Sequence, residues 1–333
     1  MKSKYKFLDS QLAIEDISSI LNIRFTELIK NIEKPNYTTF RIPKKSGGHR
    51  VVFAPCSDLM KIHNIVNNKL RSTYHMMQPK VVHGFTYKTA KEKYLDIGIK
   101  ANAKMHLNKK CILNIDIKDF FPSISISRVR AMFECPPFNY DHNLATGLAL
   151  LFCYKGQLPA GAPTSPLISN FYCLKLDADV LELSNSENIT YSRYADDLTF
   201  SSNAIIDTKF VVKVSEILKN FGFEINRKKL RKASNFQAQY VTGIKVNQTL
   251  NLNRTYYRNL RAVLHSIEQI GVSASMLKYK GKKRYILGEE HKFLSSVRGR
   301  IEYLGYIRGN NDVLYKELKN KFNALIDRAP INY

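Results

Sequence analysis

The chain has 333 residues, of which 44% are hydrophobic and 24% are charged. This balance is typical of a folded protein with one large domain or two to three packed subdomains, and it excludes a disordered chain. The 52 Lys and Arg residues outnumber the 28 Asp and Glu residues, giving a net charge of +24 at pH 7. This excess favours nucleic acid as a partner over an anionic membrane or a solvated basic surface without a partner.

Neither a membrane span nor a secretory leader is predicted. No apolar run approaches the roughly 18–20 residues that span a bilayer, and the first 16 residues lack the apolar core of a signal peptide. The five cysteines are odd in number and have no CxxC spacing, which favours buried, reduced thiols over zinc or disulfides. We therefore expect a cytoplasmic protein without membrane contact.

The first part of the chain reads as a helix, a hairpin and a second helix. Apolar residues at helical spacing predict a helix within residues 10–33. Strand-forming runs on both sides of Lys-Ser-Gly-Gly predict a hairpin over residues 37–55 with a basic tip. The next helix is expected to begin with Ser57 or Asp58 as its cap.

The middle of the chain combines an alternating strand with apolar helices. Residues 111–118 alternate in polarity, which predicts a half-buried strand with Asp116 on its open face. Residues 144–153 predict a buried helix. A Gly-Pro-rich loop at 157–166 leads into another helix over 167–183.

Two adjacent acids lie in the strand-like segment Ile189–Ser202, whose sequence is ITYSRYADDLTFSS. We expect this segment to be a hairpin with its turn at Ala195–Asp197. A helix near 207–221 and a strand over 240–247 are predicted to follow.

The last 80 residues are basic and helical in pattern. Residues 254–270 divide at 100° per residue into an apolar face and a basic face. Such a helix suits packing on the protein body while following nucleic-acid phosphates, and a solvated helix face is the alternative. The apolar face carries Tyr257, Leu260, Val263, Leu264, Ile267 and Ile270, and the other carries Arg254, Arg258, Arg261 and His265.

Three carboxylates form the candidate catalytic centre. Asp116 lies at a strand end, while Asp196 and Asp197 lie at a predicted turn where both side chains can be presented. Carboxylates on adjacent strand ends are hard oxygen ligands for Mg²⁺, and two such ions can activate a hydroxyl and stabilise a leaving pyrophosphate. Taken alone, the pair is better explained as an ordinary polar turn.

Five motifs, taken in order, resemble those of reverse transcriptases and, together, those of the bacterial retron branch. The resemblance implies an α+β right-hand polymerase fold with fingers, an antiparallel-sheet palm and a helical thumb. It divides the chain into an N-terminal helical segment (1–35), fingers and palm (36–247) and a basic thumb (248–333). The motifs are NIDIKDFFPSI (114–124), GAPTSP (161–166), YADD (194–197), GFEINRKK (222–229) and VTG (241–243).

The same resemblance assigns roles around the incoming nucleotide. Asp116, Asp196 and Asp197 would bind two Mg²⁺ ions, with Mn²⁺ as a substitute. Phe121 would exclude a 2′-hydroxyl and so favour dNTPs, with core packing as its alternative role. Lys229 would donate a proton to pyrophosphate, with Lys228 or a merely solvated lysine as alternatives.

The fingers and the Gly-Pro-rich loop complete the implied nucleotide site. Lys44, Lys45 and Arg50 match a basic hairpin that folds over the triphosphate. Relatives carry Gln in LPQGxPxSP, whereas this chain has Ala160, whose side chain forms no hydrogen bond. The effect on fidelity and nucleotide affinity is open, although the backbone at Ala160 and Gly161 can still approach the nucleotide.

Two further elements are similar to those that distinguish retron enzymes and are associated with their structured RNA. They are the NAxxH element, from Asn102 to His106, and the VTG element of Val241, Thr242 and Gly243. A structural role is the alternative for His106. With Arg254, Arg258 and Arg261, these residues form the predicted RNA-binding set.

The implied activity is RNA-directed DNA synthesis from dNTPs. A cognate structured noncoding RNA would supply template and primer, and synthesis from an internal guanosine 2′-hydroxyl would leave branched RNA-linked DNA (msDNA) bound to the enzyme. An antiphage role with a separate effector or toxin is also implied. The alternatives are another defence-associated or group II intron-like reverse transcriptase, including one that needs no template, and a ribonucleoprotein scaffold that restrains a toxin.

Overall fold

A computed structural model describes residues 18, 23–44, 47–88, 92, 97–281 and 288–328. The chain forms two compact units. Unit 1 comprises the chain up to Asn102 together with Cys111–Lys232, and unit 2 comprises Ala103–Lys110 together with the chain from Ala233 onward. The two units therefore divide the chain after Lys232. The boundary expected between palm and thumb at 247/248 lies further downstream and stays a prediction.

A four-stranded sheet forms the centre of unit 1. Its strands follow the order β4 (Thr190–Tyr194), β5 (Asp197–Ser202), β3 (Cys111–Asp116) and β6 (Arg231–Ser234). Strand β5 is antiparallel to both of its neighbours. The predicted hairpin is confirmed, with Ala195 and Asp196 as its turn.

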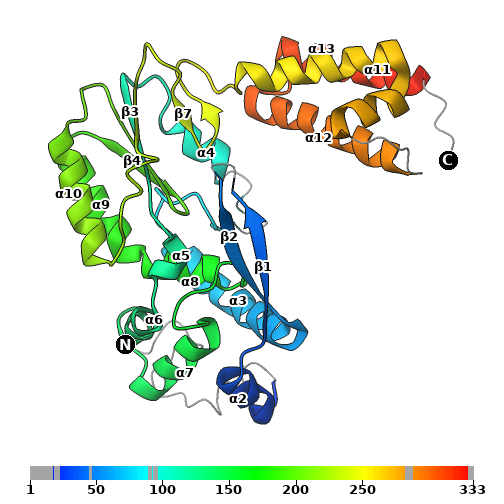
Figure 1. Ribbon diagram of the computed structural model, residues 1–333. Coiled ribbons are helices and arrows are strands. Elements are labelled where there is room, and N and C mark those ends of the chain that lie inside the picture. The colour runs from blue at the N-terminus through cyan, green and yellow to red at the C-terminus, as the bar shows by residue number, and fades with distance from the viewer. Residues whose placement is uncertain are drawn as a thin grey trace. The chain divides into compact units, whose positions relative to one another are not determined.

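Helices α9 (Leu174–Ser186) and α10 (Thr208–Asn220) cover one face of this sheet (Figure 1). Aromatic rings form the contact, because Tyr191 stacks on Phe200 at 5.2 Å and Phe200 meets Phe210 of α10 edge-on at 5.1 Å. Side chains alternate along a strand, so Asp116 and its cross-strand partner Asp197 lie on the opposite face. The apolar face of the sheet therefore orients the acids away from the helices.

Some of the other helices of unit 1 begin or end at residues different from those predicted. Helix α3 begins after Cys56, which makes no side-chain cap, so neither Ser57 nor Asp58 is the cap. The helix expected over 167–183 is two helices that meet at Cys173. Of the predicted helix within 10–33, most residues before Phe25 lie outside the described residues. The helices are α2 (Phe25–Glu33), α3 (Ser57–Met77), α4 (Ile99–Lys104), α5 (Phe120–Ser123), α6 (Ile126–Glu134), α7 (His142–Phe152) and α8 (Ser165–Tyr172).

The basic hairpin is confirmed as β1 (Tyr37–Pro43) and β2 (His49–Pro55), paired without a bulge from one end to the other. Its tip is closed by the Lys44 amide, which donates to the Gly48 carbonyl at 2.9 Å. Most of its residues are exposed. The hairpin is anchored at its base, where the Phe53 amide donates to the Ala160 carbonyl at 2.7 Å.

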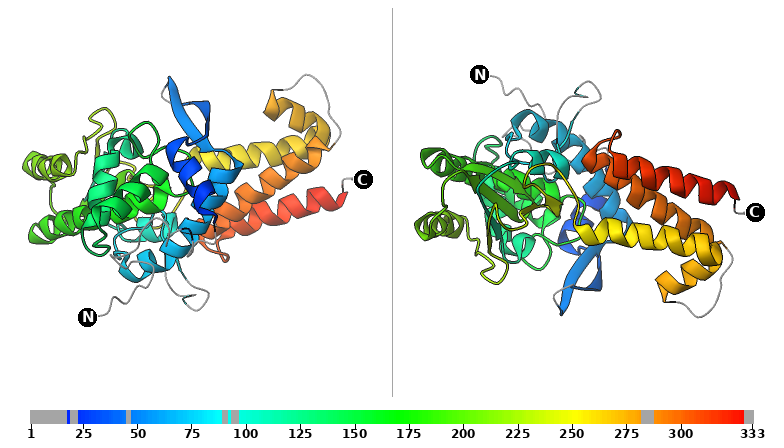
Figure 2. Two further views of the ribbon diagram at one scale, coloured as in Figure 1. Left: turned by 90° about the horizontal axis from the view of Figure 1, so that it is seen from below. Right: turned by 90° about the horizontal axis from the view of Figure 1, so that it is seen from above.

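Unit 2 contains three packed helices and a small hairpin. Helices α11 (Arg254–Lys280), α12 (Glu289–Arg308) and α13 (Val313–Arg328) lie side by side in both views of Figure 2. None of the helices in the described part of the chain is long and apolar enough to cross a membrane.

The expected strand over 240–247 is instead a tight hairpin of β7 (Tyr240–Val241) and β8 (Ile244–Lys245). Thr242 and Gly243 form its turn, with φ values of 47° and 81°. Along α11, the predicted apolar face is buried from Leu260 to Ile267, but Ile270 is half exposed. It lies next to Gly271, whose non-helical backbone kinks the helix and changes the face that follows.

Candidate active site

Three aspartates of unit 1 meet where strand β3 ends and strand β5 begins. Asp116 is the last residue of β3 and pairs directly with Asp197, the first residue of β5. Asp196 precedes it in the turn, and its carbonyl accepts a hydrogen bond from the Ile117 amide at 2.9 Å. The backbone therefore holds the three residues of the predicted centre in adjacent positions.

Asp116 is the most enclosed of the three and has two side-chain partners. Lys229 Nζ donates to Asp116 Oδ1 at 2.6 Å, and Asn226 Nδ2 donates to Oδ2 at 3.1 Å. The Asn226 amide also donates to the Asp116 carbonyl at 2.8 Å. Hydrogen bonding to Asp116 raises the pKa of Lys229, so its amine is a charged donor at neutral pH.

The pKa values of Asp196 and Asp197 are raised above those of free aspartate. Removal from water, together with the charge of Asp116, raises the pKa of Asp196, while Lys229 and Arg50 act in the opposite direction. Desolvation of the carboxylate and the charges of Asp196 and Asp116 raise the pKa of Asp197 to about 6. The residue as a whole is nevertheless exposed to solvent. This mutual repulsion is relieved by a cation.

The donor chemistry fits a hard divalent cation, since three carboxylates with mutually unfavourable charges supply oxygen ligands. Among the described residues, however, no three His, Cys, Asp or Glu side chains converge as a finished metal cluster. One of the three carboxylates, that of Asp116, is held by Lys229. A cation bound at Asp116 Oδ1 would therefore compete with the Lys229 ammonium group for that oxygen.

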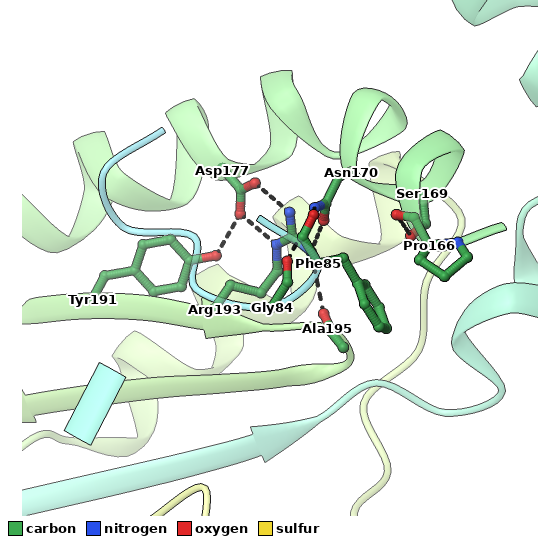
Figure 3. Close-up of polar contacts among 9 residues, drawn as sticks. All are labelled: Gly84, Phe85, Pro166, Ser169, Asn170, Asp177, Tyr191, Arg193 and Ala195. Atoms are coloured by element: carbon green, nitrogen blue, oxygen red, sulfur yellow. Dashed lines mark hydrogen bonds and ion pairs between the residues drawn. The ribbon is translucent and has the colours of Figure 1, made fainter. Parts of the chain in front are cut away.

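A buried ion pair supports the turn from behind (Figure 3). Arg193, the penultimate residue of β4, donates through Nε and Nη2 to the two carboxylate oxygens of Asp177 on α9, both at 2.7 Å. Both side chains are fully buried, and the Tyr191 hydroxyl also donates to Asp177 at 2.8 Å. Arg193 Nη1 reaches the Ala195 carbonyl in the turn at 3.2 Å.

The same network extends to the segment around Gly84 (Figure 3). Asn170 accepts from Arg193 at 3.1 Å and donates to the Gly84 carbonyl at 3.0 Å and the Phe85 carbonyl at 3.2 Å. A side chain at Gly84 would meet the Ala195 amide at 2.5 Å, so glycine permits this close approach. The predictions from sequence missed this network, although an arginine on the helix-covered face of a strand was a usable signal of a buried acid.

The predicted nucleotide residues lie mainly on three surrounding elements. Phe121 is half-buried and lies near Phe85, with ring centroids 6.2 Å apart, whereas Phe120 is buried. Lys44 and Arg50 are exposed on the hairpin, and the charge of Arg50 acts on Asp196. Lys45 lies outside the described residues.

The loop between α7 and α8 carries the predicted positions 160 and 161. Ala160 is tied to the hairpin by its carbonyl. Gly161 has a φ of 117°, and a side chain there would meet Val52 Cγ1 at 2.5 Å and the Phe53 carbonyl oxygen at 2.8 Å. Position 161 therefore requires glycine for two reasons: its positive φ disfavours a side chain, and a side chain would clash with β2.

Comparison with known proteins agrees with this arrangement. Residues 42–307 match the family model described as reverse transcriptase (RNA-dependent DNA polymerase). Retron Ec73 reverse transcriptase from Escherichia coli is 30% identical, with 96% of this chain and 94% of that protein covered. The chain belongs to the retron reverse transcriptases. This membership confirms the predicted right-hand polymerase fold.

Two further relatives of this retron reverse transcriptase are similar over a shorter span. Retron Mx65 reverse transcriptase from Myxococcus xanthus is 33% identical over 75% of this chain. Retron Ec86 reverse transcriptase from Escherichia coli is 35% identical over 61% of this chain. The match spans 62% of the length of each of these two relatives.

The RNA-binding predictions for this retron reverse transcriptase concern residues of very different exposure. Asn102, His106 and Val241 are buried, and the Ser192 hydroxyl donates to the Asn102 side chain, which favours structural roles. Gly243, Arg254 and Arg258 are exposed, and Thr242 is half-buried. Arg261 is also exposed but pairs with Glu317 at 3.0 Å. RNA contact by this set stays a prediction.

Proposed function

We propose that this protein is the RNA-directed DNA polymerase of a retron. It copies a cognate structured noncoding RNA, which serves as template and primer, and joins dNTPs into a DNA strand that remains attached to that RNA as msDNA. The observation that carries the proposal is the pairing of Asp116 with Asp197, with Asp196 beside them in a turn, inside a retron reverse transcriptase chain.

Asp116, Asp196 and Asp197 are the residues that would hold two Mg²⁺ ions, with Mn²⁺ as a substitute. Bound ions would supply Lewis-acid activation of the attacking hydroxyl and charge neutralisation at the triphosphate. The protein's own part is to position these acids, and the buried Arg193–Asp177 pair does so from behind the turn. Positioning and electrostatics are the main sources of rate in phosphoryl transfer.

Other residues act on the nucleotide. Phe121 lies half-buried beside Phe85, where a ring can exclude a 2′-hydroxyl and select dNTPs. Lys229 carries a proton that Asp116 stabilises, which suits donation to departing pyrophosphate. Lys44 and Arg50 place mobile positive charge on an exposed hairpin, where they can neutralise the triphosphate. Lys45 completes this basic set in the sequence.

The proposal extends to the cellular setting. The net charge of +24 suits a protein that stays bound to RNA and its DNA product. We place it in the cytoplasm, in an antiphage system with a separate effector or toxin, as the retron resemblance implies.

The test is to purify the protein after expression from its native operon and to sequence the bound nucleic acid. We expect one abundant structured RNA joined by a 2′–5′ branch to single-stranded DNA. Treatment with a debranching enzyme should release that DNA. Recovery of only assorted cellular RNA, with no covalently linked DNA, contradicts the retron proposal.

A further inference from the structure

A polar cavity of about 570 Å³ is lined only by residues of unit 2, none of which is assigned to the candidate active site. Its volume is in the range of small-molecule and nucleotide sites. Three stretches of chain line it: the loop at 108–110, the segment at 235–238, and residues 245–251 around the end of the small hairpin. The predictions from sequence had assigned no function to these cavity-lining residues.

The walls of the cavity are fixed by hydrogen bonds. The Asn247 side chain accepts from the Gln239 amide at 3.0 Å and donates to the Asn235 and Gln237 carbonyls at 3.1 and 2.8 Å. The Asn235 amide donates to the Lys110 carbonyl at 2.9 Å. These bonds join distant stretches of the chain, so the cavity is built by the fold.

The charge of the lining is entirely positive. Lys109, Lys110 and Lys245 contribute to it, and no acidic residue does. Within the described part of the chain, none of the three lysines forms an ion pair. A cavity with several unpaired ammonium groups favours an anion such as a phosphodiester.

An aromatic ring and amide groups complete the lining. Phe236 is 94% exposed, which is an unfavourable environment for a phenyl ring without a ligand. The side chains of Asn108 and Gln248 form no hydrogen bond with another described residue, which leaves both of them available as donors and acceptors. Stacking surface, polar edge-readers and cations are the three components of single-strand nucleic-acid recognition.

We propose that this cavity binds an unpaired nucleotide, with its base stacked on Phe236, its polar edge on the Asn and Gln amides, and its phosphate on the lysines. A base inside a duplex has both faces covered, so the exposed ring favours single-stranded segments over stems. The ligand class rests on the proposed function, which brings RNA and newly made DNA to this protein.

The test uses the purified full-length chain and fluorescein-labelled 12-nucleotide oligomers. One RNA and one DNA of the same sequence distinguish the two strands as sources of the nucleotide, and an RNA hairpin of equal length supplies the paired form. Phe236→Leu keeps an apolar side chain and removes the ring, and Lys110→Gln removes one charge. Ile205→Ala and Lys61→Gln alter an exposed apolar residue and an exposed lysine in unit 1 and serve as controls.

We expect Phe236→Leu to weaken single-strand binding by about 5- to 150-fold, the size of one base–aromatic stack, while both controls bind as wild type. Lys110→Gln should weaken binding and lower its salt dependence. A 5-iodouridine oligomer should photo-crosslink to the wild-type chain within residues 235–238. Preferential binding of RNA or of DNA then identifies the strand that supplies the nucleotide.

Two results would overturn the proposal: unchanged single-strand binding by Phe236→Leu with no cross-link at 235–238, or a Phe236-dependent preference for the RNA hairpin. Failure of the proposed function has a different signature. A wild-type chain that cannot extend a DNA primer on RNA, yet cross-links at 235–238, refutes the polymerase assignment and keeps the nucleotide site.

Discussion

Asp116 shares its carboxylate between an ammonium group and an amide, and this determines how a metal can bind. Lys229 lies 2.6 Å from Oδ1, and Asn226 lies 3.1 Å from Oδ2. A divalent cation that binds Oδ1 would therefore compete with Lys229 for that oxygen. The competition links the acid that binds metal to the lysine that we expect to protonate pyrophosphate.

The variant Lys229→Gln should bind Mn²⁺ more tightly in the absence of nucleotide while synthesising DNA more slowly. Removal of a nearby positive charge is worth about 1 kcal/mol in a solvated site, or about fivefold in affinity. Isothermal titration with Mn²⁺ measures the effect. Lys228→Gln removes the same charge one residue away, and an equal gain in that variant would show that Lys229 does not compete directly.

The raised pKa of Asp197 predicts a pH-dependent stability in the metal-free protein. An acid whose pKa rises from 3.8 to about 6 on folding destabilises the fold when ionised, and this penalty disappears as the pH falls from about 6 toward 4. Asp197→Asn should therefore raise the Tm at pH 7.5 in the presence of chelator, by roughly 2–4 °C.

The advantage of Asp197→Asn should shrink at pH 5, where the wild-type acid is largely protonated. Thermal melts at both pH values measure it, with Asp179→Asn on α9 as the matched control. A Tm difference that stays constant between pH 7.5 and 5 contradicts the assigned electrostatics.

The buried charge of Arg193 is expected to contribute to the stability of the fold. Replacement by Met leaves Asp177 buried without its counter-ion, which costs about 3–5 kcal/mol, and removes the donor to the Ala195 carbonyl. Arg193→Met should lower the free energy of unfolding by that amount in a urea titration. The double variant Arg193→Met/Asp177→Leu should recover part of it, and no recovery would argue against an ion-pair origin.

The proximity of the three aspartates could be predicted from sequence because Asp116 ends an alternating strand, Asp196 and Asp197 lie at a turn, and the ordered motifs connect them. The partners of Asp116 and Arg193 could not be predicted in the same way. Asn226 and Asp177 lie 110 and 16 residues from their respective partners, and only the packing of the chain brings them together. Burial of Asn102 and His106 was likewise invisible in the sequence, because polar side chains are more often exposed.

At the scale of elements, the hairpin β1–β2 depends on one glycine in the loop after α7. Gly161→Ala would place a methyl group 2.5 Å from Val52 Cγ1 at a backbone φ of 117°. We expect the hairpin to shift and the kcat/KM for dNTP to fall roughly 10- to 100-fold, as for other small misplacements. Primer-extension kinetics measure this.

Gly156→Ala is the control for Gly161→Ala. Gly156 has a positive φ of 77° but open space around it, so that variant carries backbone strain without a clash. An equal fall in kcat/KM for dNTP in both variants would show that backbone strain alone, and not the contact with β2, determines the effect.

The periodicity of the sequence predicted helices and strands correctly where local pattern and packing agree, as in β3, β5 and α10. Two departures have identifiable causes, and a third does not. Thr242 and Gly243 take left-handed conformations that turn one expected strand into a hairpin, and Gly271 kinks α11 so that Ile270 is exposed. The break at Cys173 carries no helix-breaking residue, and sequence pattern did not predict it.

At the scale of the whole molecule, charge and motif order point to the same role. The excess of 24 positive charges indicates a polyanion, and the ordered motifs span both compact units. The unit boundary was not visible in the sequence, because residues 103–110 leave unit 1 to pack with the chain after residue 232. The cavity that we assign to an unpaired nucleotide depends on this long-range association.

We propose that Asp116, Asp196 and Asp197 catalyse DNA synthesis on an RNA template. Incorporation of labelled dNTPs opposite a primed RNA template with Mg²⁺ tests this for wild type, for each Asp→Asn variant, and for the control Asp179→Asn on α9. We predict synthesis by wild type and the control, a loss of at least about 10²-fold in Asp116→Asn and Asp196→Asn, and no synthesis with chelator. Full synthesis by either variant, with wild-type folding, would contradict the account.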